Sequence, residues 1–192
     1  MEGLNESVSM AAEELSSLET SRESAIACSR RIIRLTKMVI HDIHSGSDPS
    51  ENLVQLESQM ELLRSLSVDP NVSCSGPVQD AMGEYAEAVI LHRIITDEPI
   101  VDHRELGISA SAWILGLADS EGELRRTVMT KLMDGDLASA KDIFSKMEAV
   151  HEQVMLLDVP DSIAPVRRKQ DIARGIMDKT RSDITTASIM QR

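Results

Sequence analysis

Apolar residues recur at helical spacing over most of the chain, in segments that are separated by turn-forming residues. The first segment runs from about residue 13 to 44, with Leu15, Leu18 and Ile26 among its apolar positions. It ends at a Ser-Gly-Ser-Asp-Pro stretch. Further helices are predicted over about 50–66, 77–96, 110–133, 137–157 and from 166 to near the C-terminus. All six prolines fall between these segments, where helices tolerate proline.

The same pattern predicts the fold class. No run of β-branched residues alternates with polar ones, so strands are not expected. Only Tyr85, Trp113 and Phe144 are aromatic, so the core must be built from aliphatic residues and Met. We therefore predict an all-α, single-domain antiparallel bundle of about six to seven helices over residues 1–192. The first and last helices are longer than such a bundle covers, so either they pack against another subunit or their ends fray.

Composition limits the possible locations and partners. No apolar stretch approaches the roughly 18 residues of a membrane-spanning helix, and the N-terminus is acidic and Ser-rich. We expect a soluble, cytoplasmic protein with no membrane partner. Cys28 and Cys74 are expected to be reduced thiols, with a disulfide as the alternative. The net charge of −12 argues against a basic coat that grips duplex nucleic acid, but it allows a local basic stripe.

Two acidic pairs are the candidate groups for chemistry. Glu84 and Glu87 are three residues apart, and Asp119 and Glu123 are four apart, so each pair shares one face of its helix. Carboxylate oxygens are the ligands that Mg²⁺ and Mn²⁺ prefer, so the pairs could hold a divalent ion. The alternative for each pair is a solvated helix face, which is the commoner outcome for such spacing alone.

Small residues accompany the second acidic pair. Ala112 and Gly116 share the face of Asp119 and would let a neighbouring helix approach closely. Gly122 in a helix interior costs about 1 kcal/mol relative to alanine, so a packing or functional reason is expected for it. Ser50 and Ser109 are predicted to cap the helices that follow them.

A basic stripe follows one face of the first predicted helix. Arg30, Arg34, Lys37, His41 and His44 recur at spacings of four, three, four and three residues. On an acidic protein this stripe is a candidate phosphate-binding face. The alternative is a solvated face that pairs with acids of a neighbouring helix. A second basic cluster, residues 167–169, is expected at the surface.

Three segments resemble the translin superfamily, and they are closer to its translin-associated factor X branch than to translin itself. They are residues 29–37 (SRRIIRLTK), residues 84–88 (EYAEA) and residues 115–126 (LGLADSEGELRR). The resemblance covers most of the chain in order, and the short length is similar to archaeal forms.

The resemblance implies about seven helices per subunit and a hollow homo-oligomer of eight subunits. For the factor X branch it implies an endoribonuclease that uses Mg²⁺ or Mn²⁺ to cut single-stranded RNA. The acidic catalytic and metal-binding residues of the family match four positions here: Glu84, Glu87, Asp119 and Glu123.

The expected RNA-binding residues, which would clamp the backbone without reading bases, are Arg30, Arg34, Lys37 and Arg126. Two alternatives stay open. One is a non-catalytic oligomer of the translin type that binds single-stranded RNA or DNA. The other is a helical scaffold that binds other proteins.

Overall fold

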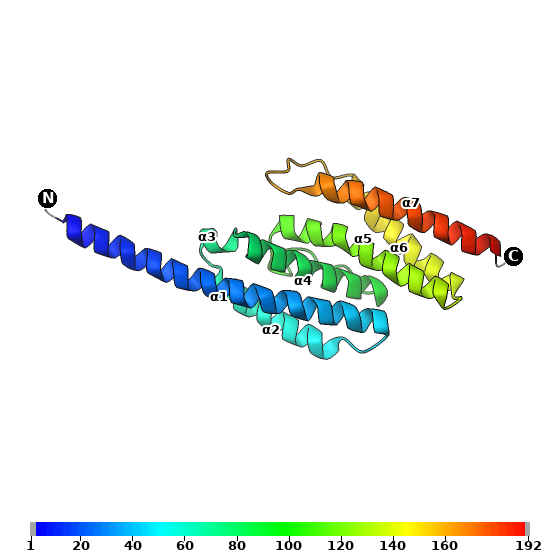
Figure 1. Ribbon diagram of the computed structural model, residues 1–192, viewed down its shortest axis with the longest axis horizontal. Coiled ribbons are helices and arrows are strands. Elements are labelled where there is room, and N and C mark those ends of the chain that lie inside the picture. Colours follow the sequence, from blue (N-terminus) through cyan, green and yellow to red (C-terminus); the bar gives the residue numbers. More distant parts are fainter. Residues whose placement is uncertain (1–2, 191–192) are drawn as a thin grey trace.

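The computed structural model describes residues 3–190 and contains, over those residues, seven helices and no strand (Figure 1). The all-α prediction is therefore confirmed. None of these helices is long and apolar enough to cross a lipid bilayer. The helices are α1 (Leu4–Ser45), α2 (Ser50–Leu66), α3 (Pro70–Ser73), α4 (Gly76–Ile95), α5 (Ala110–Met133), α6 (Leu137–Met155) and α7 (Val166–Met190).

The predicted helix boundaries are close to those observed, with two differences at the N-terminal end of the chain. Helix α1 begins at Leu4, well before the predicted start, because no proline or glycine interrupts residues 4–12. The short helix α3 was not predicted. It is capped by Asp69, whose side chain accepts a hydrogen bond from the backbone N–H of Asn71 at 2.7 Å.

The two predicted serine caps had different outcomes. Ser109 caps α5 by accepting a hydrogen bond from the backbone N–H of Ala112 at 3.1 Å. Ser50 does not cap α2, because it is already the first helical residue, and Pro49 holds the cap position. Both Cys28 and Cys74 are free thiols, as predicted.

Four helices lie side by side in a row, and two more pack behind it (Figure 1). Helix α1 contacts α4, α4 contacts α5, and α5 contacts α7. Helix α2 packs against α1, and α6 packs against both α5 and α7. The row α1–α4–α5–α7 therefore forms one broad face of the molecule, with α4 and α5 in its middle.

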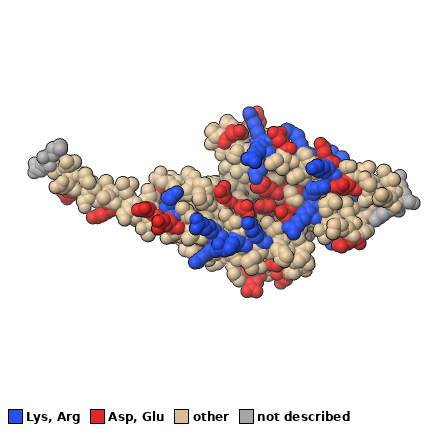
Figure 2. All heavy atoms as spheres, in the orientation of Figure 1, with Lys and Arg blue, Asp and Glu red and all other residues tan. Residues whose placement is uncertain are grey.

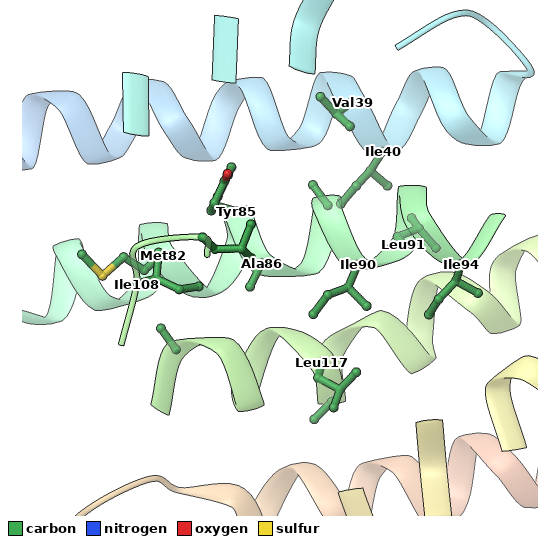
Figure 3. Packing of buried hydrophobic residues seen from close by; sticks show 14 of the residues in the cluster. Val39, Ile40, Met82, Tyr85, Ala86, Ile90, Leu91, Ile94, Ile108 and Leu117 are labelled. Atoms are coloured by element: carbon green, nitrogen blue, oxygen red, sulfur yellow. The ribbon is translucent and has the colours of Figure 1, made fainter. Parts of the chain in front are cut away.

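Helix α4 is the most buried element of the row, and it packs between α1 and α5. Ile90 and Leu91 are almost completely buried, and Figure 3 shows them between Val39 of α1 and Leu117 of α5. The hydroxyl of Tyr85 donates a hydrogen bond to Glu57 of α2. This aliphatic packing fixes the position of α4 and of the carboxylates it carries.

The closest approach in the row is between α4 and α5, at Gly116. A Cβ at this position would lie 2.5 Å from the carbonyl oxygen of Gly83, 2.7 Å from the Cβ of Ala86 and 2.9 Å from the backbone nitrogen of Glu87. The backbones of the two helices therefore touch, as the small residues predicted. Gly122 is different, because a Cβ there would meet nothing within 4 Å. The packing reason expected for Gly122 is not found.

These two glycines make a matched pair of variants. We expect Gly116→Ala to lower the free energy of unfolding by roughly 1–3 kcal/mol, because the added methyl group must push α5 away from α4. Gly122→Ala should raise it by about 0.5–1 kcal/mol, because alanine loses less backbone entropy in a helix. Urea unfolding followed by circular dichroism measures both. Equal effects of the two substitutions would contradict a contact role for Gly116.

Candidate active site

The close contact at Gly116 brings the two acidic pairs together. Glu84 and Glu87 on α4 and Asp119 and Glu123 on α5 are all half-buried. The negative charges of the other three act on Glu87, and that of Asp119 also acts on Glu84. Figure 2 shows acidic side chains gathered in the middle of the face formed by the helix row, over α4 and α5. The sequence placed each pair on its own helix face; the structure joins them into one cluster, which we call the carboxylate cluster.

Glu87 lies deepest in the carboxylate cluster. Burial raises its pKa first, and the neighbouring charges of Asp119, Glu84 and Glu123 raise it further, to about 8. Burial also raises the pKa of Glu84. In the protein alone, Glu87 therefore carries a proton at neutral pH, because a fourth negative charge is unfavourable in this place.

Two basic side chains, one from each flanking helix, hold the outer members of the cluster. Lys169 of α7 donates from Nζ to both oxygens of Asp119, at 2.5 Å and 2.7 Å. His44 of α1 donates from Nε2 to Oε2 of Glu123 at 2.5 Å. That hydrogen bond lowers the pKa of Glu123 below its usual range. Arg167 and Arg168 are exposed, as expected for the cluster 167–169, and Lys169 is partly exposed. Its contact with Asp119 was not predicted and arises because α7 packs against α5.

The basic stripe of α1 is present and mostly solvent-exposed. Arg30, Arg34 and Lys37 are exposed, and none of them forms an ion pair with another residue between 3 and 190. The alternative of a stripe paired with acids of a neighbouring helix therefore applies to His44 but not to these three. Free exposed cations beside an acidic cluster remain available for an anionic ligand.

The four predicted RNA-binding residues do not all lie in one place. Lys37 and Arg126 line a pocket of about 400 Å³ together with Glu84, Glu87 and Glu123. The guanidinium Nη1 of Arg126 is 3.5 Å from Oε2 of Glu123. Thus two of the predicted cations border the carboxylate cluster directly.

The other two predicted cations lie outside that pocket. Arg34 borders a separate groove between α1 and α2, where it lies beside Met38 and Val54. Arg30 is exposed one turn earlier on α1. The stripe therefore leads away from the carboxylate cluster along α1, as Figure 2 also shows for the Lys and Arg side chains over this helix.

The chemistry of the cluster fits a divalent cation, although no group of three His, Cys, Asp or Glu side chains among residues 3–190 is arranged to hold one. Asp119 and Glu123 point their oxygens at Lys169 and His44 instead. Burial and the charges of the other three carboxylates keep Glu87 protonated, so the four acids form a set of hard oxygen donors that is short of positive charge. Glu84, Glu87, Asp119 and Glu123 could accommodate Mg²⁺ or Mn²⁺ once Lys169 and His44 give up these contacts.

A second buried acid on α5 lies apart from this cluster. Glu121 is completely buried and accepts a hydrogen bond from Nδ1 of His151 on α6 at 2.9 Å. Burial raises its pKa, and its other oxygen has no hydrogen-bond partner among the described residues. Sequence reasoning missed this pair, because nothing local distinguishes Glu121 from the half-buried acids Asp119 and Glu123 of the same helix.

Comparisons with known proteins agree with the fold. No family model matches the chain. The uncharacterized protein MJ0175 of Methanocaldococcus jannaschii is 36% identical over 176 residues, which cover 90% of this chain and 78% of that protein. Two structures of the translin-type protein AfC3PO, one of them a complex with duplex RNA, superpose with TM-scores of 0.88 and 0.89. Their sequences are 29% and 28% identical, over 95% of this chain and 97% of theirs.

The chain belongs to the translin superfamily. The structure of apo-NeC3PO, with a TM-score of 0.82 and 22% identity over 94% of this chain and 96% of that one, shows the same fold. The superfamily expected from the sequence is therefore confirmed. In this translin-superfamily protein the carboxylate cluster lies on one face, between a basic helix and α7.

The raised pKa of Glu87 predicts a pH dependence of stability. Below pH 4.5 the carboxyl is protonated in the folded and the unfolded chain, so it causes no difference. Between pH 4.5 and about 8 the unfolded chain releases the proton while the folded chain keeps it, and stability is lost. In chelator, Glu87→Gln should therefore melt higher than the wild type at pH 8, with Tm rising about 2–4 °C for each kcal/mol gained.

The control for that measurement is Glu61→Gln, which changes an exposed glutamate of α2 in the same way. Its profile of Tm against pH should run parallel to that of the wild type. If the Glu87→Gln profile is parallel as well, Glu87 is not the buried, crowded acid that the structure describes.

Proposed function

We propose that this protein is a divalent-metal-dependent endoribonuclease of the translin-associated factor X branch, which cuts single-stranded RNA inside a hollow homo-oligomer. The observation that carries the proposal is the carboxylate cluster itself, in which three other acids from α4 and α5 surround Glu87. Such a concentration of carboxylates is unfavourable for folding unless a cation uses it. A complete acidic set also favours this branch over a translin that only binds nucleic acid.

The likeness to AfC3PO supports RNA as the ligand. That protein has been solved in complex with duplex RNA, and its fold matches over 95% of this chain. The electrostatics agree with a polyanion, because Lys37 and Arg126 line the same pocket as three of the carboxylates. Only 2% of the residues are aromatic, so contacts to the phosphate backbone, not base stacking, would hold the RNA.

The roles of the residues follow from their places. Glu84, Glu87, Asp119 and Glu123 would hold Mg²⁺ or Mn²⁺. The bound ion would supply a polarised phosphate and an activated water for phosphodiester hydrolysis. Lys37 and Arg126 would orient the scissile phosphate over the cluster from the rim of the pocket.

The remaining cations would extend this contact. Arg30 and Arg34 would bind further phosphates along α1, because they lie about two turns and one turn, respectively, before Lys37 on the same helix. They would add affinity without distinguishing one base from another.

Helix α1 supports the assembly that we propose. Its first buried residue is Ala25, and the part before it extends beyond the bundle (Figure 1). Leu4, Val8 and Leu15 on this part are 45%, 59% and 65% exposed. A projecting helix with apolar side chains gains tertiary stabilisation when it packs against another chain. We propose a homo-octamer, and native mass spectrometry tests it, because a monomeric mass would contradict any assembly.

The catalytic proposal is tested with labelled single-stranded and duplex RNA, each with Mg²⁺, Mn²⁺ or chelator. We expect cleavage of the single strand with either metal and none in chelator. Glu87→Gln should reduce the rate by at least about a hundredfold, because it removes a charged ligand from the cluster. Glu61→Gln, the same substitution at an exposed site, should cut at the wild-type rate.

The same assay separates catalysis from binding alone. If the protein binds RNA but does not cut it with any metal, its function is that of a non-catalytic RNA-binding oligomer and not of a nuclease. That second function is favoured by one observation, namely that Asp119 and Glu123 already have the protein side chains Lys169 and His44 as partners.

RNA binding by the α1 stripe makes its own prediction. Lys37→Ala should weaken binding of a single-stranded RNA in chelator, equally for different sequences, and lower the salt slope of the binding constant by about 1. Lys141→Ala, which changes an exposed lysine of α6, should leave both unchanged. Fluorescence anisotropy over a range of salt concentrations measures both quantities. A sequence-dependent loss would mean that Lys37 reads bases.

A further inference from the structure

Lys169 lies at the start of a helix, which is an unusual position for a lysine. It lies in the first turn of α7, where the helix dipole disfavours positive charge, and Arg167 and Arg168 add two more charges there. The helix to which Lys169 belongs therefore gives no reason for its position. The carboxylate cluster does, because Nζ contacts both Asp119 oxygens, at 2.5 Å and 2.7 Å.

The contact between Lys169 and Asp119 is of the kind that an ion would make. An ammonium that faces both oxygens of one carboxylate covers the edge that a chelated cation uses. The charge of Lys169 also reaches Glu84 and Glu87, whose pKa values it lowers against the effect of burial. Lys169 thus supplies positive charge to three of the four carboxylates.

The packing of α7 on α5 does not depend on this contact alone. Further along the two helices, Arg125 of α5 donates to Asp183 at 2.9 Å and to the hydroxyl of Thr180 at 2.8 Å. That ion pair lies away from the carboxylate cluster and joins the same two helices. It shows by comparison how much an ion pair between α5 and α7 contributes to stability when the carboxylate cluster is not involved.

Lys169 also has room to move. It lines a pocket of about 850 Å³ whose other lining residues include Asp80, Ser111 and Ser162. Its side chain is one-third exposed. The ammonium can therefore leave Asp119 and remain hydrated, with the carboxylate of Asp80 on the same pocket wall.

We propose that Lys169 is an internal counter-ion that holds Asp119 while no divalent ion is bound and is displaced from it when an ion binds. The inference rests on the proposed metal-dependent function. It makes Lys169 a positioning residue, which acts through Asp119, and it links ion binding to the first turn of α7. Protein and metal then compete for the same two oxygens.

The exchange is tested by measuring Mn²⁺ affinity from the free-ion electron paramagnetic resonance signal, with melting curves in Mn²⁺ and in chelator. Lys169→Met should bind Mn²⁺ at least about tenfold more tightly than the wild type, because Asp119 no longer has to release an ammonium. Its Tm should be lower in chelator and should recover in Mn²⁺. Lys169→Arg keeps the charge and should stay within about threefold of the wild-type affinity.

Two further variants separate this exchange from simpler effects. Lys37→Met removes a cation that acts on Glu84 but does not touch Asp119. It therefore measures how much Mn²⁺ affinity rises when positive charge near the cluster is lost in general. That gain should be smaller than for Lys169→Met. Arg125→Met removes the other ion pair between α5 and α7, and it should lower Tm equally in Mn²⁺ and in chelator without changing affinity. Lys169→Gln replaces Lys169→Met if the latter does not fold.

Each outcome decides between the proposals. If the wild type binds Mn²⁺ and folded Lys169→Met binds it no more tightly, the exchange is overturned. The proposed metal-dependent function then remains intact. A gain equal to that of Lys37→Met also overturns it, because charge alone would then explain the effect. If no form of the protein binds Mn²⁺, both the exchange and the metal dependence of the proposed function fail.

Discussion

The contact between the backbones of α4 and α5 at Gly116 is the constraint on which the candidate site depends. A side chain at this position would overlap Gly83, Ala86 and the backbone of Glu87, so only glycine allows the two helices this separation. Because Glu87 lies directly at the contact and Asp119 follows one turn later on α5, the helix separation sets the distance between the acidic pairs. The core around Ile90 and Leu91 then holds α4 in place from the α1 side.

Close helix packing creates an electrostatic problem that the flanking helices reduce. Burial of Glu87, together with the negative charges of the other three carboxylates, raises its pKa to about 8. Lys169 from α7 and His44 from α1 offset part of it by pairing with the outer members of the cluster. The cluster is therefore tolerated in the folded protein without being neutral, which is the condition under which an added cation stabilises it.

The arrangement of charge explains how a chain with a net charge of −12 can present a surface for a polyanion. Of its 52 charged side chains, 32 are acidic and 20 basic, so a uniform distribution would repel RNA. The structure instead exposes Arg30, Arg34 and Lys37 on α1, the helix that packs beside α4 in the row, and Figure 2 shows Lys and Arg side chains gathered over α1. Local concentration, and not net charge, decides whether phosphate can approach the carboxylate cluster.

The sequence by itself determined the helices and the two acidic pairs, because both are local properties. Proline and turn residues mark the helix ends, and spacings of three and four residues put Glu84 with Glu87 and Asp119 with Glu123 on common faces. It also predicted the close approach at Gly116. It did not determine the start of α1, since residues 4–12 have no core contact that a periodic pattern would reveal.

Only the tertiary structure decided which cations meet the acids. Lys169 is 50 residues from Asp119 and His44 is 79 residues from Glu123. The pairing of Glu121 with His151 was equally hidden. These contacts depend on the order α1–α4–α5–α7 and on the rotation of each helix about its own axis. Side chains from the whole core determine both, and no short segment of sequence contains that information.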